Sequence, residues 1–221
     1  MLMNAFSLSH QQRSARFAMR ATGGALLSIA LLLSGCASVT PHTETSAISS
    51  ARSYQHAIEI EGRLSLQYQQ QGQDESLHGS FTWQQQDDQH STLTLRSPLG
   101  QVIATIAIAP GIATLTESGK APRAAGDVDA LVAQSLGWPL PIAGLQRWLQ
   151  GFAMDANGNP FIAHGEGSAV TTQDSWQLRY ANWQQAASGQ TYARRIDLTR
   201  QTAQAGKVDL RIVIDNWQPR P

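Results

Sequence analysis

One thiol is the side chain of this protein best suited to covalent chemistry. Cys36 is the only cysteine among 221 residues, and it directly follows the small residues Ser34 and Gly35. An apolar run from Ala25 to Leu33 precedes it, and three arginines but no acidic residue stand upstream of it. A basic start, a short apolar stretch and small residues at a cleavage point are the parts of a secretory signal. The sequence therefore predicts export of the chain and cleavage close to Cys36.

A cysteine at the cleavage point resembles the bacterial lipoprotein signal, in which the thiol receives a diacylglycerol and becomes the acylated N-terminus. One alternative is a plain secretory signal with a buried cysteine nearby. Another is a transmembrane helix, which the short apolar run disfavours because it cannot span a bilayer. Ala37 follows the cysteine. Because aspartate at that position commonly retains lipoproteins at the inner membrane of enteric bacteria, alanine fits delivery to the outer membrane.

The other reactive side chains form no pattern typical of catalysis. The six histidines are scattered along the chain without the spacing of metal ligands. We find no nucleophile elbow, no phosphate-cradling glycine loop and no cysteine pair. We therefore expect no catalytic residue, no metal site and no cofactor, and we do not expect an enzyme. A lipid or cell-wall hydrolase would need a polar cluster that the sequence does not offer.

Charge and length limit the partners and the organisation. The formal net charge is zero, and the predicted signal removes three arginines, which leaves a slightly acidic mature chain. Such a chain is not expected to bind nucleic acid or to adhere electrostatically to anionic lipid. Membrane attachment would then depend on acyl chains. We expect a lipoprotein signal peptide at residues 1–35, a flexible tether at 36–52 and one folded domain at 53–221.

A period of two runs through most of the predicted domain. Apolar and polar residues alternate, which is typical of antiparallel strands with one buried and one solvated face. The alternating segments are Ile58–Tyr68, Leu77–Trp83, Leu93–Leu95, Val102–Ile108, Trp176–Tyr180, Tyr192–Leu198 and Val208–Ile214. These segments predict an α+β fold with one dominant sheet.

Two segments in the middle of the chain have helical periodicity instead. Residues 127–136 place their apolar residues on one helical face, with Asp127 as the expected N-cap and Gly137 as the expected stop. Residues 141–149 form a second apolar stripe, with Pro141 in the first turn and Gly151 after the end. The sequence predicts a helical hairpin between two groups of strands.

The predicted sheet has more apolar surface than two short helices can cover. A sheet of roughly eight to eleven strands curls, and it closes into a barrel or leaves a concave side for the helices to cover. An apolar hollow that binds apolar ligands is one outcome. A core filled by bulky side chains is the other, and the pattern alone leaves both open.

Several motifs, in this order, make the chain similar to the LolB family of outer-membrane lipoprotein-localisation factors. They span about Ile58 to Trp217, and no single one is specific. The motifs are Gly62–Leu66, Gly79–Trp83, Leu95–Gly100, Leu136–Pro141 followed by Leu145–Gly151, and Leu210–Trp217.

The resemblance implies an unclosed, antiparallel, lipocalin-like β-barrel with a helical lid around an apolar cavity. It implies a monomeric receptor, lipid-anchored in the outer membrane and facing the periplasm. Such a receptor accepts acylated lipoproteins from a LolA-like periplasmic carrier and inserts them into the inner leaflet. The alternative is a lipid-anchored β-domain that scaffolds an envelope complex and encloses no acyl ligand. The sequence does not indicate which lipoproteins are cargo or how many acyl chains are held.

Leu99 is the strongest candidate for contact with a membrane. Ser97, Pro98 and Gly100 suit positions i, i+1 and i+3 of a type I turn, which places Leu99 at the tip of a hairpin. From the residues alone, Leu99 either dips into lipid or folds back onto the sheet. In the LolB family the leucine of this Pro-Leu-Gly loop inserts into the membrane, and Leu99 matches it.

Three tryptophans are expected to line the cavity and contact acyl chains. Trp83 and Trp176 lie on predicted strands, and Trp148 lies on the second predicted helix. The alternative for each is an ordinary place in the core. We expect Trp138 to fix the lid at the elbow between the helices and Trp217 to close the sheet.

Overall fold

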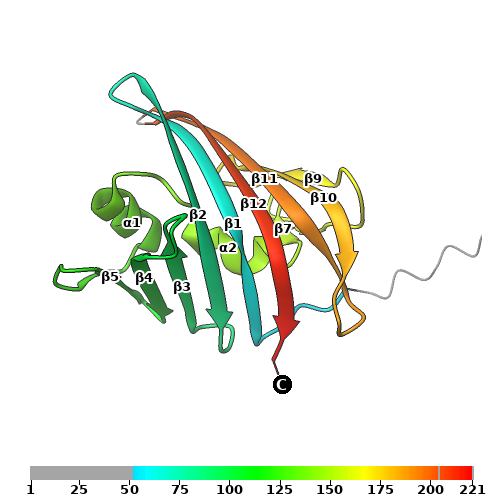
Figure 1. Cartoon of the computed structure of the whole chain (residues 1–221). Helices are drawn as coiled ribbons and strands as arrows, with labels where there is room; N and C mark the ends of the chain where they lie inside the picture. The colour runs from blue at the N-terminus through cyan, green and yellow to red at the C-terminus, as the bar shows by residue number, and fades with distance from the viewer. Residues whose placement is uncertain (1–51, 204, 221) are drawn as a thin grey trace, which may run out of the picture. The chain divides into compact units, whose positions relative to one another are not determined.

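A ten-stranded antiparallel sheet dominates the computed structural model, which describes residues 52–203 and 205–220 (Figure 1). The strand order is β6-β5-β4-β3-β2-β1-β12-β11-β10-β9, and the edge strands β6 and β9 are not paired with each other. The strands are β1 (Ile58–Gln70), β2 (Gln73–Gln85), β3 (Ser91–Arg96), β4 (Val102–Ala109), β5 (Ile112–Glu117), β6 (Arg123–Ala125), β9 (Ala169–Thr171), β10 (Gln177–Gln185), β11 (Thr191–Thr202) and β12 (Gly206–Pro219). A separate hairpin joins β7 (Phe152–Met154) to β8 (Pro160–Ile162).

The chain divides into two units, residues 1–43 and residues 44–221, and every described residue belongs to the second. Cys36, the predicted signal at 1–35 and the predicted tether up to residue 51 lie outside the described residues. The described residues contain a core built from the sheet and both helices. No helix among them is long and apolar enough to cross a membrane.

Alternation along the strands confirms the predicted period of two. In β1, Ile58, Ile60 and Leu64 are buried, whereas Glu61 and Arg63 between them are exposed. The same pattern runs through β2, β3, β11 and β12, so that one face of the sheet is apolar. The strands β5 to β9 were not among the predicted segments, and β6 to β9 have only three residues each, too few to carry a periodicity.

A β-bulge between β1 and β12 shapes the centre of the sheet. Glu61 pairs with Asn216 and Gly62 pairs with Ile214, so Asp215 is an extra residue in β12. The extra residue lets both Ile214 and Trp217 lie on the buried face. A Cβ on Gly62 would lie only 2.3 Å from the carbonyl oxygen of Val213.

We expect Gly62→Ala to lower the free energy of unfolding by about 1–3 kcal/mol, because the added methyl group meets backbone that cannot rotate away. Gly165→Ala is the matched control, since a Cβ there has no neighbouring atom within 4 Å. Denaturant unfolding of the two variants measures the difference. Equal stability of both would show that β12 shifts freely at the bulge.

Both predicted helices are present, with the expected capping at the first. Asp127 caps α1 (Val128–Leu136) by accepting a 3.0 Å hydrogen bond from the Ala130 N–H, and Gly137 ends it in the left-handed conformation at φ 80°. Pro141 is the N-cap of α2 (Ile142–Trp148), one position before the first turn that the sequence predicted.

The helices cover the apolar face of the sheet. Figure 1 shows α1 and α2 on the same side of the curved sheet. The first helix contacts β5 and β6, and the second contacts β7. The fold is therefore an unclosed antiparallel sheet with two helices against it, as the sequence predicted.

Candidate functional site

The three predicted tryptophans all lie in the apolar interior between the sheet and the helices. Trp83, Trp148 and Trp176 are 1%, 6% and 3% exposed. The rings of Trp148 and Trp176 have centroids 6.4 Å apart, so the second helix meets the chain beside β10. Trp176 precedes β10 by one residue and is not part of that strand, which corrects the predicted extent of the strand. All three belong to one core cluster.

With the helices in place, side chains fill this interior. Ile142 and Leu149, at the two ends of α2, are 0% and 2% exposed. Five of the cavities in the described residues lie on the outer face or at the rim of the sheet, and none of these five has Trp83, Trp148 or Trp176 in its lining. Space for a long apolar guest would therefore require the helices to move away from the sheet.

Hydrogen bonds hold the second helix down at two places. Gln146 donates from Nε2 to the carbonyl oxygen of Asp88, in the turn between β2 and β3, at 2.9 Å. Gln150 is 3% exposed and donates to the carbonyl oxygen of Gln55 at 3.0 Å, while its Oε1 accepts from the Gln55 N–H at 2.8 Å. Gln85, fully buried, donates to the carbonyl oxygen of His56 at 2.8 Å. Breaking them to lift α2 also uncovers buried apolar residues of that helix, so opening has a free-energy cost.

A carboxylate links the two helices. The Ala143 N–H at the start of α2 donates to Oδ1 of Asp129 in α1 at 3.0 Å. Burial raises the pKa of Asp129 above its ordinary value of 3.8, and the charges of Asp127 and Asp174 raise it further. The hydrogen bond from Ala143 acts in the opposite direction. The joint between the helices therefore contains a carboxylate that folding makes harder to ionise.

We expect Asp129→Asn to raise the unfolding temperature at neutral pH. A raised folded-state pKa favours the protonated acid, so wild-type stability falls as the pH rises through 3.8 and through the folded-state value. Asparagine removes the charge and keeps an oxygen that can accept from Ala143. The gain should shrink as the pH falls towards 3.8, which thermal unfolding at several pH values measures.

Asp155→Asn is the control, because it is expected to change stability in the opposite direction. Hydrogen bonds from the backbone and side chain of Asn159 lower the pKa of Asp155, so this carboxylate stabilises the fold above its ordinary pKa of 3.8. The substitution should therefore lower stability at neutral pH, and the loss should fade in acid. If Asp129→Asn raised the unfolding temperature equally at every pH, the result would contradict a raised pKa of Asp129.

Leu99 lies at the tip of the turn between β3 and β4, as predicted. The Gly100 N–H donates to the carbonyl oxygen of Ser97 at 2.9 Å, and the Ser97 N–H donates to that of Gln101 at 2.8 Å. Gly100 has a φ of +83°, which favours glycine at this position. The Leu99 residue is 89% exposed, the largest fraction among the large hydrophobic residues in the described region. It does not fold back onto the sheet, and its insertion into a membrane stays a prediction.

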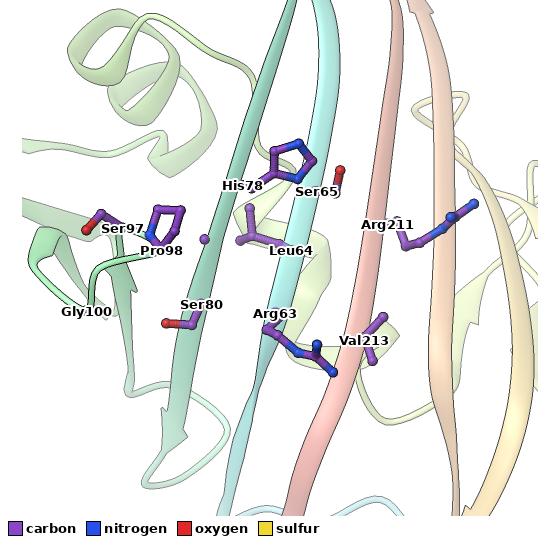
Figure 2. Close-up of a pocket in the computed structure, with 11 residues that line it drawn as sticks. Arg63, Leu64, Ser65, His78, Ser80, Ser97, Pro98, Gly100, Arg211 and Val213 are labelled. Atoms are coloured by element: carbon purple, nitrogen blue, oxygen red, sulfur yellow. The ribbon is translucent and has the colours of Figure 1, made fainter.

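An outer cavity of about 450 Å³ separates this turn from the middle of the sheet (Figure 2). Pro98 and Gly100 line one side, and outward side chains of β1 and β12, including Arg63 and Arg211, line the other. Arg63 donates two 2.9 Å hydrogen bonds to the carboxylate of Asp215. Because these charged side chains face solvent, the cavity is distinct from the apolar interior, and the sequence did not predict it.

Backbone geometry turns Trp183, to which the sequence assigned no role, towards the interior. Regular alternation after the buried Tyr180 would turn residue 182 inward and residue 183 outward. Asn182 instead has a φ of +58°, and it is exposed while Trp183 is partly buried. Asparagine tolerates this conformation better than most residues. Neither periodicity nor composition marks the position in advance.

Two kinds of sequence comparison match this chain to one family. A model of the family described as outer membrane lipoprotein LolB matches residues 56–217. The outer-membrane lipoprotein LolB of Cupriavidus necator is 38% identical over 208 residues, which cover 94% of this chain and 99% of that relative. The protein of the same name from Cupriavidus taiwanensis is 36% identical over 212 residues, with coverage of 94% and 99%.

The crystal structure of a LolA superfamily protein from Nitrosomonas europaea superposes with a TM-score of 0.46 at 9% identity, over 78% of this chain and 90% of that chain. The family match covers the sheet from β1 to all but the last two residues of β12, both helices, and the turn that carries Leu99. This chain therefore belongs to the family of the outer membrane lipoprotein LolB.

Proposed function

We propose that this protein is a lipoprotein receptor anchored in the outer membrane by acyl chains on Cys36 and facing the periplasm. It accepts acylated lipoproteins from a LolA-like periplasmic carrier and inserts them into the inner leaflet of the outer membrane. It acts as a monomer and without a chemical step. The observation that carries this proposal is an apolar interior, lined by tryptophans, whose cover is two short helices.

The interior suits acyl chains because their burial there is driven by the hydrophobic effect. Sheltering a methylene group contributes about 0.8 kcal/mol, so a fully sheltered sixteen-carbon chain contributes roughly 12 kcal/mol. Part of that free energy must open the helices, because side chains fill the interior while they are closed. The opening cost lowers the net affinity for cargo. A receptor tuned in this way binds cargo more tightly than the carrier does and less tightly than the bilayer does, and transfer proceeds without a nucleotide.

The exposed leucine suits the last step. A turn with Leu99 at its tip can enter a leaflet and disturb its packing, while the rest of the hairpin stays in water. Burying the leucine contributes on the order of 2 kcal/mol. This is enough to orient the domain on a membrane and too little to hold it there without the lipid anchor.

A transfer assay tests the proposal. A soluble form of residues 37–221, which contains every described core residue, is mixed with a carrier loaded with acylated lipoprotein. We expect the lipoprotein to move to the soluble form, and an unacylated version to remain unbound. In cells, depletion of the protein should cause lipoproteins to accumulate on the carrier. A folded soluble form that takes up no acylated lipoprotein would refute the proposal.

The packed interior favours a second candidate, a lipid-anchored scaffold that holds an envelope complex through the outer face of its sheet. The five outer and rim cavities in the described residues are the observation behind it. A scaffold predicts that substitutions on the outer face release protein partners while no acyl chain is bound. The transfer assay separates the two functions, because only the receptor takes up the acylated lipoprotein.

A further inference from the structure

An arginine side chain is partly buried at one end of the apolar interior. The guanidinium carbon of Arg52 lies 4.1 Å from the ring centroid of Trp183. Its Nη1 lies so close to Gly151, just after α2, that a Cβ there would be 2.5 Å away. Ser53 follows, and its Oγ accepts a 2.8 Å hydrogen bond from Gln190. The chain before β1 is thus held against both the helical cover and β10.

Two nitrogen donors of this arginine and the hydroxyl of Tyr180 have no acceptor among the described residues. Nε and Nη1 of Arg52 and the hydroxyl of Tyr180 are buried without a hydrogen-bond partner among the described residues. Tyr180 is 0% exposed, and Phe161 stacks on its ring with centroids 6.3 Å apart. Burial raises the pKa of Tyr180, so its hydroxyl keeps its proton. Arg52 is near enough for its charge to oppose that rise.

Donors without acceptors are rare inside proteins, since more than about 90% of buried polar groups are paired. A guanidinium carries five N–H donors and no acceptor, so the side chain cannot satisfy its own buried N–H groups. The surroundings are aromatic, and a group that binds there must present oxygen acceptors on an otherwise apolar body. Ester and amide carbonyls at the head of an acyl chain have this chemistry.

We propose that Arg52 and Tyr180 bind the carbonyl oxygens of the linkages that join acyl chains to the lipoprotein N-terminus. This inference rests on the proposed function and adds to it the position and orientation of the guest. The acyl chains extend from Tyr180 towards Trp148 and Trp176, and the polypeptide of the cargo leaves past Arg52. Aromatic side chains provide the shelter, and these two donors set the depth of insertion.

The test compares two probes that differ only at the proposed contact. One is a synthetic lipopeptide with two ester-linked acyl chains, and the other is its ether-linked analogue with chains of equal length. We expect the soluble form to bind the ester probe about thirtyfold more tightly, because two carbonyl hydrogen bonds contribute about 1 kcal/mol each. Tyr180→Phe should lose about half of the logarithm of the ester-to-ether affinity ratio. Arg52→Met should lose most of the other half.

Tyr180→Phe keeps this test independent of folding. Its hydroxyl has no partner in the part of the chain that the structure describes, so its removal should leave the unfolding temperature unchanged or higher. Tyr192→Phe is the matched control, since that hydroxyl donates to Oε1 of Gln184 at 3.2 Å. The control should lose some stability and keep the full preference for the ester probe.

Each outcome decides a different question. Equal binding of ester and ether probes by the wild type would overturn the carbonyl assignment and leave the receptor function standing. Binding of neither probe would refute the receptor function, and this inference with it. Loss of the ester preference in excess inorganic phosphate, with ether binding unchanged, would show that the donors form a general anion site, which also overturns the assignment.

Discussion

Leu99→Glu is expected to leave uptake of acylated lipoprotein near normal and to slow its release into membranes at least about thirtyfold. The leucine is 89% exposed at the tip of its turn, whereas the three tryptophans are buried, so its replacement does not touch the interior. The factor follows from about 2 kcal/mol of lost leucine burial in lipid, and placing a carboxylate in the leaflet adds to the loss.

Release is measured by loading the lipidated protein with a fluorescent lipoprotein and following transfer to vesicles. Ile112→Glu is the matched control, because Ile112 is 49% exposed at the next hairpin and carries no predicted membrane role. We expect that variant to release cargo at the wild-type rate. If both variants release cargo normally, the turn does not insert, and if both are slow, charge on the domain rather than Leu99 is responsible.

Fixing the second helix to the sheet is expected to lower uptake of an acylated probe at least about tenfold, since the proposed receptor binds acyl chains only in its open state. Gln146 and Asp88 are already joined by a hydrogen bond across the gap between α2 and the β2–β3 turn. The soluble form lacks Cys36, the only cysteine, so Asp88→Cys and Gln146→Cys provide a unique pair for a short bis-maleimide.

The control pair lies on the outer side of one hairpin. Gln67 and Ser76 are register partners in β1 and β2 and are both exposed, so cross-linking cysteines there leaves the helices free. We expect normal uptake with this pair, and normal uptake by the uncross-linked Asp88→Cys/Gln146→Cys protein. Normal uptake after cross-linking the Asp88–Gln146 pair would mean that the acyl chains enter without movement of α2.

Local signals predicted the helices and the turn that exposes Leu99. Asp127 and Gly137 mark the ends of α1 because capping depends on residues within one turn of the helix. The turn around Leu99 was predictable for the same reason, since serine, proline and glycine act on their own backbone. The long strands were predictable because apolar and polar residues alternate along them with a period of two.

Features that depend on pairing between distant segments were not predictable. The bulge at Gly62 arises from the pairing of β1 with β12, and it alone explains how Ile214 and Trp217 share the buried face. The positive φ at Asn182 turns Trp183 towards Arg52, although the surrounding sequence is polar. The space left between sheet and helices depends on every side chain in the core, so the pattern could not decide between a hollow and a filled interior.

The most direct measurement asks whether acyl chains enter the interior beneath the helices. A lipopeptide with bromine atoms in its acyl chains is added to the soluble form, and the tryptophan fluorescence of the protein is followed. We expect strong quenching by the brominated probe and none by the unbrominated one, with a smaller effect in Trp148→Phe. Tight binding of the probe without quenching would place its chains elsewhere and contradict the account.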